Sequence, residues 1–208
     1  MTRGRIAICG TGRAGTTLLV KLLHRAGLET GYDDTDLCET DRHVAQAGLE
    51  RVPSPRTIER FPDVFKSPQL HKVGERGLRE GWLALDLLIV PMRDVDEVVR
   101  SRRSVTLRQI TGYIRGAPLR GGMVGGARNV FRQREVLLDG FYRTIEMAAK
   151  HRIELILLEF PRLARDPDHF AGRLAEPLAR LRGVSPDALI AAHRAECRPE
   201  LIRHSAAS

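Results

Sequence analysis

The chain has 208 residues, which is enough for one domain with a sizeable apolar core. Its net charge of +8 raises the question of nucleic-acid binding, but only four of its 34 basic residues are lysine and the arginines are spread along the whole chain. With few aromatic residues to stack on bases, this composition favours a site for an anionic small molecule over a nucleic-acid surface.

The first predicted elements are a strand, a glycine turn and a helix. The apolar run RIAIC (5–9) suits a buried parallel strand, and TTLLVKLLHRAG (16–27) carries apolar residues at helical spacing up to a glycine stop. After a long acidic segment, DVFKSP (63–68) predicts a second short strand that ends at Pro68.

The middle of the chain predicts a central strand followed by a helix. LALDLLIVPMRD (83–94) is the clearest strand, expected to end at Pro91, and DVDEVVRSRRSVTLRQI (94–110) follows as a helix. Asp94 is expected to cap this helix while Glu97 reaches back, as in a capping box. The glycine-rich stretch 112–126 is interpreted either as a mobile lid or as a plain surface loop.

The last part of the chain again predicts helices and a strand in alternation. These are a helix over 127–151, a strand over 152–160, a helix over 166–183 and a short helix that begins at Pro186. Strands alternating with helices predict an α/β fold: a single-domain, three-layer parallel sheet with helices on both faces, like the P-loop nucleoside-triphosphate hydrolases. One domain over 1–208 accounts for the chain.

The turn after the first strand, GTGRAGTT, resembles a phosphate loop. Glycines allow the turn, backbone N–H groups gather around an anion, and the helix dipole adds its positive end. Thr16 stands where ATPases keep the loop lysine, so the cation has to come from elsewhere, and Arg13 lies inside the loop. The expected anion-binding residues are Gly12, Arg13, Ala14, Gly15, Thr16 and Thr17.

Two further stretches are expected to face the same opening. Arg93 follows the central strand and Ser101 lies eight residues further on, so the pair could hold a second phosphate at the carboxyl edge of the sheet. Lys66 ends the second strand and would point into the same crevice. Taken alone, Arg93 is better explained by pairing with Asp94 or Asp96, and Ser101 by a place on the solvent face.

Together, GRAGTTLL, FKSP and IVPMRDVDEVVRSRR resemble the sulfotransferase family, which uses 3′-phosphoadenosine 5′-phosphosulfate (PAPS) as sulfuryl donor. In that family the first motif binds the 5′-phosphosulfate and the arginine–serine motif binds the 3′-phosphate. Threonine in the ATPase lysine position is then the family norm. Val95 where proline is usual and Ala14 where serine is common depart from the family pattern.

The resemblance implies sulfuryl transfer without a metal to a hydroxyl of a small-molecule or carbohydrate acceptor. Arg13, Lys66 and Asp34 are the expected catalytic residues, with Asp34 as the base. Other candidates for the base are Asp33, His43 and His71. The sequence leaves the acceptor open.

Two other functions stay open from the residues: a P-loop kinase that uses ATP and magnesium, and a nucleotide-binding module without catalysis. Three cysteines without metal-ligand spacing, no apolar run near the ~20 residues of a membrane span, and no signal-peptide pattern predict a cytoplasmic protein with no membrane partner. A homodimer is left open.

Overall fold

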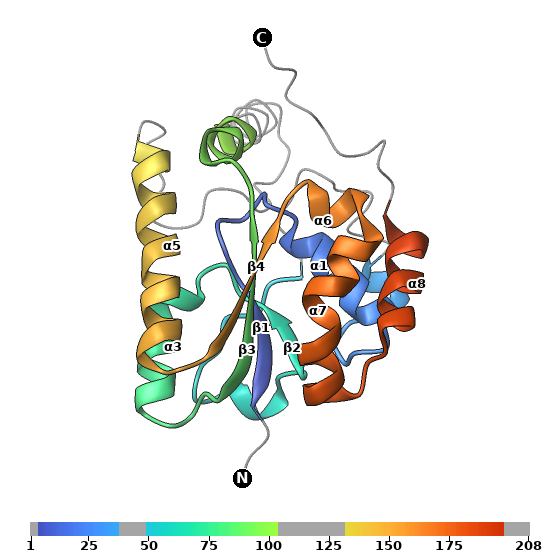
Figure 1. The fold of residues 1–208 in the computed structure, drawn as a ribbon. Coiled ribbons are helices and arrows are strands. Elements are labelled where there is room, and N and C mark those ends of the chain that lie inside the picture. Colours follow the sequence, from blue (N-terminus) through green and yellow to red (C-terminus); the bar gives the residue numbers. More distant parts are fainter. Residues whose placement is uncertain (1–3, 38–48, 104–131, 198–208) are drawn as a thin grey trace.

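A four-stranded parallel sheet forms the centre of the computed structural model, which describes residues 4–37, 49–103 and 132–197 (Figure 1). The strands are β1 (Arg5–Ile8), β2 (Val64–Lys66), β3 (Leu85–Met92) and β4 (Glu154–Glu159). All neighbouring strands pair in parallel. The four predicted strands and the α/β class with a parallel sheet are therefore confirmed.

The order of the strands, β2-β1-β3-β4, determines where a ligand site belongs. After β1, the chain places β2 on one side of β1 and then β3 on the other side. The direction in which successive strands are added to the sheet therefore reverses at β1. In open α/β sheets the crevice beyond the carboxyl ends of the strands at such a reversal is where ligands bind. The loops that follow β1 and β3 meet at this place.

Helices cover both faces of the sheet (Figure 1). On one face lie α1 (Thr16–Arg25), α7 (Pro167–Arg182) and α8 (Pro186–Glu196); on the other lie α3 (Leu70–Arg79) and α5 (Gln133–Lys150). The strands are accordingly apolar on both sides, and β1 buries Ile6, Ala7 and Ile8 completely. The expected three layers are thus present in the described residues.

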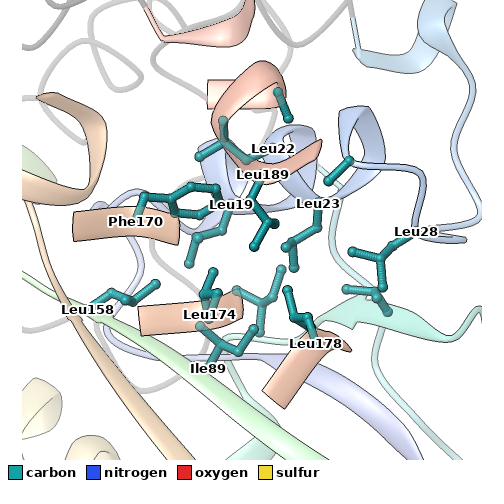
Figure 2. Packing of buried hydrophobic residues seen from close by; sticks show 14 of the residues in the cluster. Leu19, Leu22, Leu23, Leu28, Ile89, Leu158, Phe170, Leu174, Leu178 and Leu189 are labelled. Atoms are coloured by element: carbon teal, nitrogen blue, oxygen red, sulfur yellow. The ribbon is translucent and has the colours of Figure 1, made fainter. Parts of the chain in front are cut away.

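The larger core lies between the sheet and the α1–α7–α8 layer (Figure 2). Leucines recur on one side of α1 and meet an apolar stripe of α7, with side chains of α8, β3 and β4 closing the cluster. Each such side chain stabilises the fold by about 1.5–3 kcal/mol when fully buried. The labelled members are Leu19, Leu22, Leu23, Leu28, Ile89, Leu158, Phe170, Leu174, Leu178 and Leu189.

Local capping explains the bounds of the last helices. The Asp166 side chain accepts from the backbone N–H of His169 and opens α7, which ends at Gly183 in the left-handed conformation. The Ser185 side chain opens α8 in the same way. Two short turns, Ile58–Arg60 and α6 (Arg162–Arg165), and helical segments at 34–37 and 95–103 complete the described elements.

Two expectations about the central strand and its helix need correction. β3 does not end at Pro91 but runs on to Met92. The backbone of Pro91 faces the β1 side, where β1 has already ended, so the missing N–H of proline costs no hydrogen bond to a neighbouring strand. Asp94 caps the following helix as predicted, accepting from the Glu97 N–H at 2.9 Å. The Glu97 side chain, however, binds Arg93 at 2.7 Å.

Helix α3 was not predicted. Its sequence carries two glycines, Gly74 and Gly77, which disfavour an isolated helix. The tertiary structure uses them for close packing: a side chain on Gly74 would lie 2.7 Å from Met147 Sδ, and one on Gly77 would lie 2.7 Å from Trp82. Among the described residues, no helix is long and apolar enough to cross a membrane.

Candidate anion-binding site

The loop between β1 and α1 has a backbone shape suited to an anion. Gly10, Gly12 and Gly15 have positive φ angles of 129°, 57° and 90°. Arg13, between them, also lies in the left-handed region at φ 66°, which is uncommon for a residue with a side chain. Backbones that visit this region turn successive N–H groups toward one point and form anion-binding concavities. Strain of this kind is frequent at functional sites.

The loop ends at the N-terminus of α1, where peptide N–H groups are left over and the helix dipole is positive. Gly15 is the N-cap, and within the described residues no side chain caps the helix and its first turn holds no acidic residue. Thr16 is buried at 3% exposure, whereas Thr17 is half-buried. This helix end can therefore accept an anionic ligand, whereas α7 and α8 bind the side chains of Asp166 and Ser185 at their own N-termini.

Lys66 reaches the loop from the carboxyl end of β2. Its Nζ donates to Thr17 Oγ1 at 3.0 Å and lies 3.6 Å from Glu50 Oε1, with the side chain only 2% exposed. Burial lowers the pKa of Lys66, Glu50 opposes this shift, and the nearby charge of Arg13 adds to it. An ammonium group is thus held beside the first turn of α1.

The segment after β3 reaches the same loop. The Arg13 Nε donates to Ser101 Oγ at 3.2 Å, across 88 positions of sequence. Next to it, Arg102 donates to the backbone carbonyl of Thr11 and, at 3.5 Å, to Gln133 Oε1 of α5. Burial and the charge of Arg13 lower the pKa of Arg102. The structure therefore brings Arg13, Lys66, Thr17 and Ser101 together, as expected.

Arg93 lies in the same region but is held by a carboxylate. Its Nε donates to Glu97 Oε2 at 2.7 Å, and its guanidinium lies 5.3 Å from the centre of the Phe160 ring. Phe160 also packs against the loop, since a side chain on Gly15 would lie 2.8 Å from its ring. A phosphate that binds Arg93 has to replace or share its contact with Glu97.

Asp34, the expected base, is not brought to the loop. Its carboxylate is 67% exposed and binds Arg25 at 2.9 Å, at the last residue of α1. The loop lies at the other end of this helix, about 15 Å away along its axis. Asp33 and Asp36 hydrogen-bond to each other's backbone N–H. His43 and the glycine-rich stretch 112–126 lie outside the described residues.

His71, the last candidate for the base, lies on the α3–α5 side of the sheet. Its ring approaches Gly140 of α5, and burial lowers its pKa. It lines a surface groove between the two helices together with Glu75, Asp139, Tyr142, Arg143 and Glu146. The described contacts of His71 are with α5 and with the backbone of Pro68.

Two residues of the site were missed by sequence reasoning. Arg102 follows Ser101 in a run of arginines, and its position directly after this predicted anchor was the available signal. Glu50 sits in an irregular segment, and it comes to Lys66 because the Arg51 N–H donates to the Lys66 carbonyl at 2.8 Å. No local pattern indicates that pairing.

Cys9 is buried at the end of β1, beside this loop. Burial raises the pKa of its thiol to about 12, so the group stays protonated at neutral pH and is a poor nucleophile. Among the described residues, no group of three or more histidines, cysteines or carboxylates is arranged to hold a metal ion.

Comparison of the chain with protein-family models, curated proteins and solved structures gives no match. The chemistry of the site is therefore argued from its own geometry. Backbone N–H groups, a helix N-terminus and three cations meet at the strand-order reversal, which together provide a site for a multiply charged anion.

Proposed function

We propose that the protein is a cytoplasmic sulfotransferase with a P-loop-like fold, which moves a sulfuryl group from PAPS to a hydroxyl of a small-molecule or carbohydrate acceptor. The hydrogen bond between Arg13 and Ser101 carries the proposal, because it joins the two sequence motifs that the family uses for one nucleotide. The loop supplies one anion site. Arg93, whose guanidinium lies against the Phe160 ring, supplies the second.

The residues present fit such a donor. Arg13, Lys66 and Arg102 offer three positive charges close to one another, and the left-handed glycine loop offers backbone N–H groups. A planar guanidinium also binds phosphate or sulfate with two parallel hydrogen bonds. The 3′-phosphate is assigned to Arg93, with Ser101 available to either phosphate site.

The donor supplies an activated sulfuryl group whose bridging oxygen takes up negative charge when its bond to sulfur breaks. Arg13, Lys66 and the N–H groups of residues 14–17 are placed to stabilise that charge, which is the main task in this class of transfer. A base must take the acceptor's proton. Asp34 could serve only after leaving Arg25 and moving toward the loop.

The contact between Lys66 and Thr17 favours this chemistry over ATP-dependent phosphoryl transfer. In P-loop ATPases the hydroxyl at this position binds magnesium. Here the Lys66 ammonium donates to that hydroxyl at 3.0 Å, so a cationic side chain already stands where the metal would be. The nucleotide preference of the protein decides between the two functions.

Thermal unfolding with 3′-phosphoadenosine 5′-phosphate, the product nucleotide, and with ATP plus magnesium tests the proposal. At a hundredfold excess over its dissociation constant, the bisphosphate should add about 2.7 kcal/mol of stability. Arg93→Ala should weaken the bisphosphate more than adenosine 5′-phosphosulfate, whereas Arg100→Ala, an exposed arginine of the same segment, should weaken neither. Stabilisation by ATP plus magnesium alone would overturn the sulfotransferase proposal.

A further inference from the structure

Glu50 holds an unusual position for a carboxylate: it stands among the cations that are proposed to bind an anion. Its Oε1 lies 3.6 Å from Lys66 Nζ, and its charge also reaches Arg102. A carboxylate here opposes binding of a phosphate or sulfate unless it does something else for the site. Its side chain is 27% exposed, so it could turn to water, yet it faces the buried lysine.

The chain next to Glu50 is anchored in several places. The Arg51 N–H donates to the Lys66 carbonyl at 2.8 Å, the Arg51 side chain donates to the Gly31 carbonyl at 2.7 Å, and its guanidinium lies 4.7 Å from the centre of the Tyr32 ring. These contacts fix the residue after Glu50 against the end of β2. Glu50 is thereby held beside Lys66 by the backbone and not only by its own charge.

Lys66 needs such a partner. It is 2% exposed, and Arg13 is a second cation beside it, so burial and like charge both favour the neutral amine, which would be a weaker partner for an anion. Glu50 acts against both effects. Among the residues that the structure describes, Lys66 faces Thr17 of α1, Arg13 of the loop and Glu50, with Arg102 near the last two.

We propose that Glu50 is a positioning residue that keeps the Lys66 ammonium charged and directed at Thr17 until the donor's anionic group arrives. This inference rests on the proposed function for the identity of that anion. In the nucleotide-free protein Glu50 is the internal counter-ion of Lys66, and the donor takes over that role when it binds. Glu50 therefore acts through Lys66 and does not itself contact the reacting atoms.

The direct test is the titration of Lys66 by NMR, which is simple because the chain has only four lysines, Lys21, Lys66, Lys72 and Lys150. With ¹³C-labelled lysine, the Lys66 signal should titrate below the usual range of a lysine side chain. In Glu50→Gln it should titrate lower still, by about one pH unit, the size expected for a charge at this distance even in a water-like dielectric. Glu59→Gln, which changes an exposed carboxylate of the turn Ile58–Arg60, should leave it unchanged.

The functional test is the affinity for 3′-phosphoadenosine 5′-phosphate from neutral to alkaline pH. Affinity should fall when Lys66 loses its proton, and the fall should begin about one pH unit lower in Glu50→Gln than in the wild type. At neutral pH the variant should bind as tightly as the wild type or more tightly, because a competing anion is gone. Glu50→Asp should restore part of the profile.

The outcomes separate this inference from the proposed function. An unchanged Lys66 titration in Glu50→Gln, or an equal loss of affinity at every pH, would overturn the role of Glu50. A wild type that does not bind the bisphosphate at any pH would overturn the proposed function, while the lysine titration would still decide whether Glu50 keeps Lys66 charged.

Discussion

Two buried cations lie at opposite edges of the same sheet and have different surroundings. At the amino edge, Arg182 of α7 is 3% exposed and contacts two carboxylates, Asp63 at 3.2 Å and Asp86 at 3.4 Å, as well as the Gly4 carbonyl. At the carboxyl edge, Lys66 is 2% exposed, has Glu50 at 3.6 Å, and is affected by a second cation, Arg13.

The difference separates a cation with fixed structural partners from the cation that we propose binds a ligand. Two carboxylates and two carbonyls give Arg182 permanent partners and tie α7 to the segments before β1 and β2 and to β3. Burial lowers the pKa of Lys66 by more than the charge of Glu50 raises it. The amino edge is arranged for stability, and the carboxyl edge favours an added anion.

The largest expected effect comes from Arg182→Met, which leaves two carboxylates without their cation. Removing one partner of a buried ion pair is strongly destabilising, and since both aspartates are partly exposed we expect a loss of about 3 kcal/mol in the free energy of unfolding. Urea denaturation measures it. Arg180→Met, which removes an exposed arginine of the same helix, should cost less than about 1 kcal/mol. Equal losses would contradict the structural role of Arg182.

Arg13→Ala should act on binding and not on stability. Losing a charge-assisted contact to a phosphate weakens binding by about 1.5–3 kcal/mol, or roughly 10- to 100-fold. Isothermal titration with 3′-phosphoadenosine 5′-phosphate measures the loss, and Arg100→Ala is the matched control, because that side chain is exposed on the segment that carries Ser101. A similar loss in both variants would point to general electrostatic attraction.

Lys66→Met should cost less stability than Arg182→Met. One carboxylate, Glu50, loses its cation instead of two, and the apolar side chain removes a charge that burial already disfavours, so we expect a change of less than about 1 kcal/mol in the free energy of unfolding. The bisphosphate affinity should fall at the same time. Urea denaturation and titration calorimetry on the same sample measure the two effects. A loss of stability as large as that of Arg182→Met would mean that Lys66 is a structural cation like Arg182.

The smallest effect concerns a buried histidine of the α1–α7–α8 layer. His193 of α8 lies 2.9 Å from the Leu163 carbonyl, and burial lowers its pKa. The unfolded chain therefore binds this proton more readily, so stability is full above about pH 6.5 and is lost as the pH falls below that value. His193→Gln should reduce the difference between urea midpoints measured at about pH 7.5 and about pH 5.5. An unchanged difference would show that other groups cause the acid sensitivity.

The site was predictable where a local pattern carries the chemistry. Strand, glycine loop and helix follow one another in the sequence, so the anion loop and the contribution of Arg13 could be recognised before the fold was known. Asp34 failed to reach the loop for a physical reason: α1 separates them by its full length and ends in Arg25, which binds the aspartate. Sequence proximity to a loop does not place a side chain beside it.

The sequence by itself determined the local elements: four apolar strands, the caps at Asp94 and Asp166, and a left-handed loop that only glycines and one strained arginine could form. These follow from periodicity and backbone preferences within a few residues. Only the tertiary structure decided which charges meet. Strand order puts β1 between β2 and β3, and the contacts of Lys66 with Thr17 and of Arg13 with Ser101 depend on that order, because they join positions far apart in the chain. Glu50 reaches Lys66 through the backbone pairing of Arg51 with Lys66.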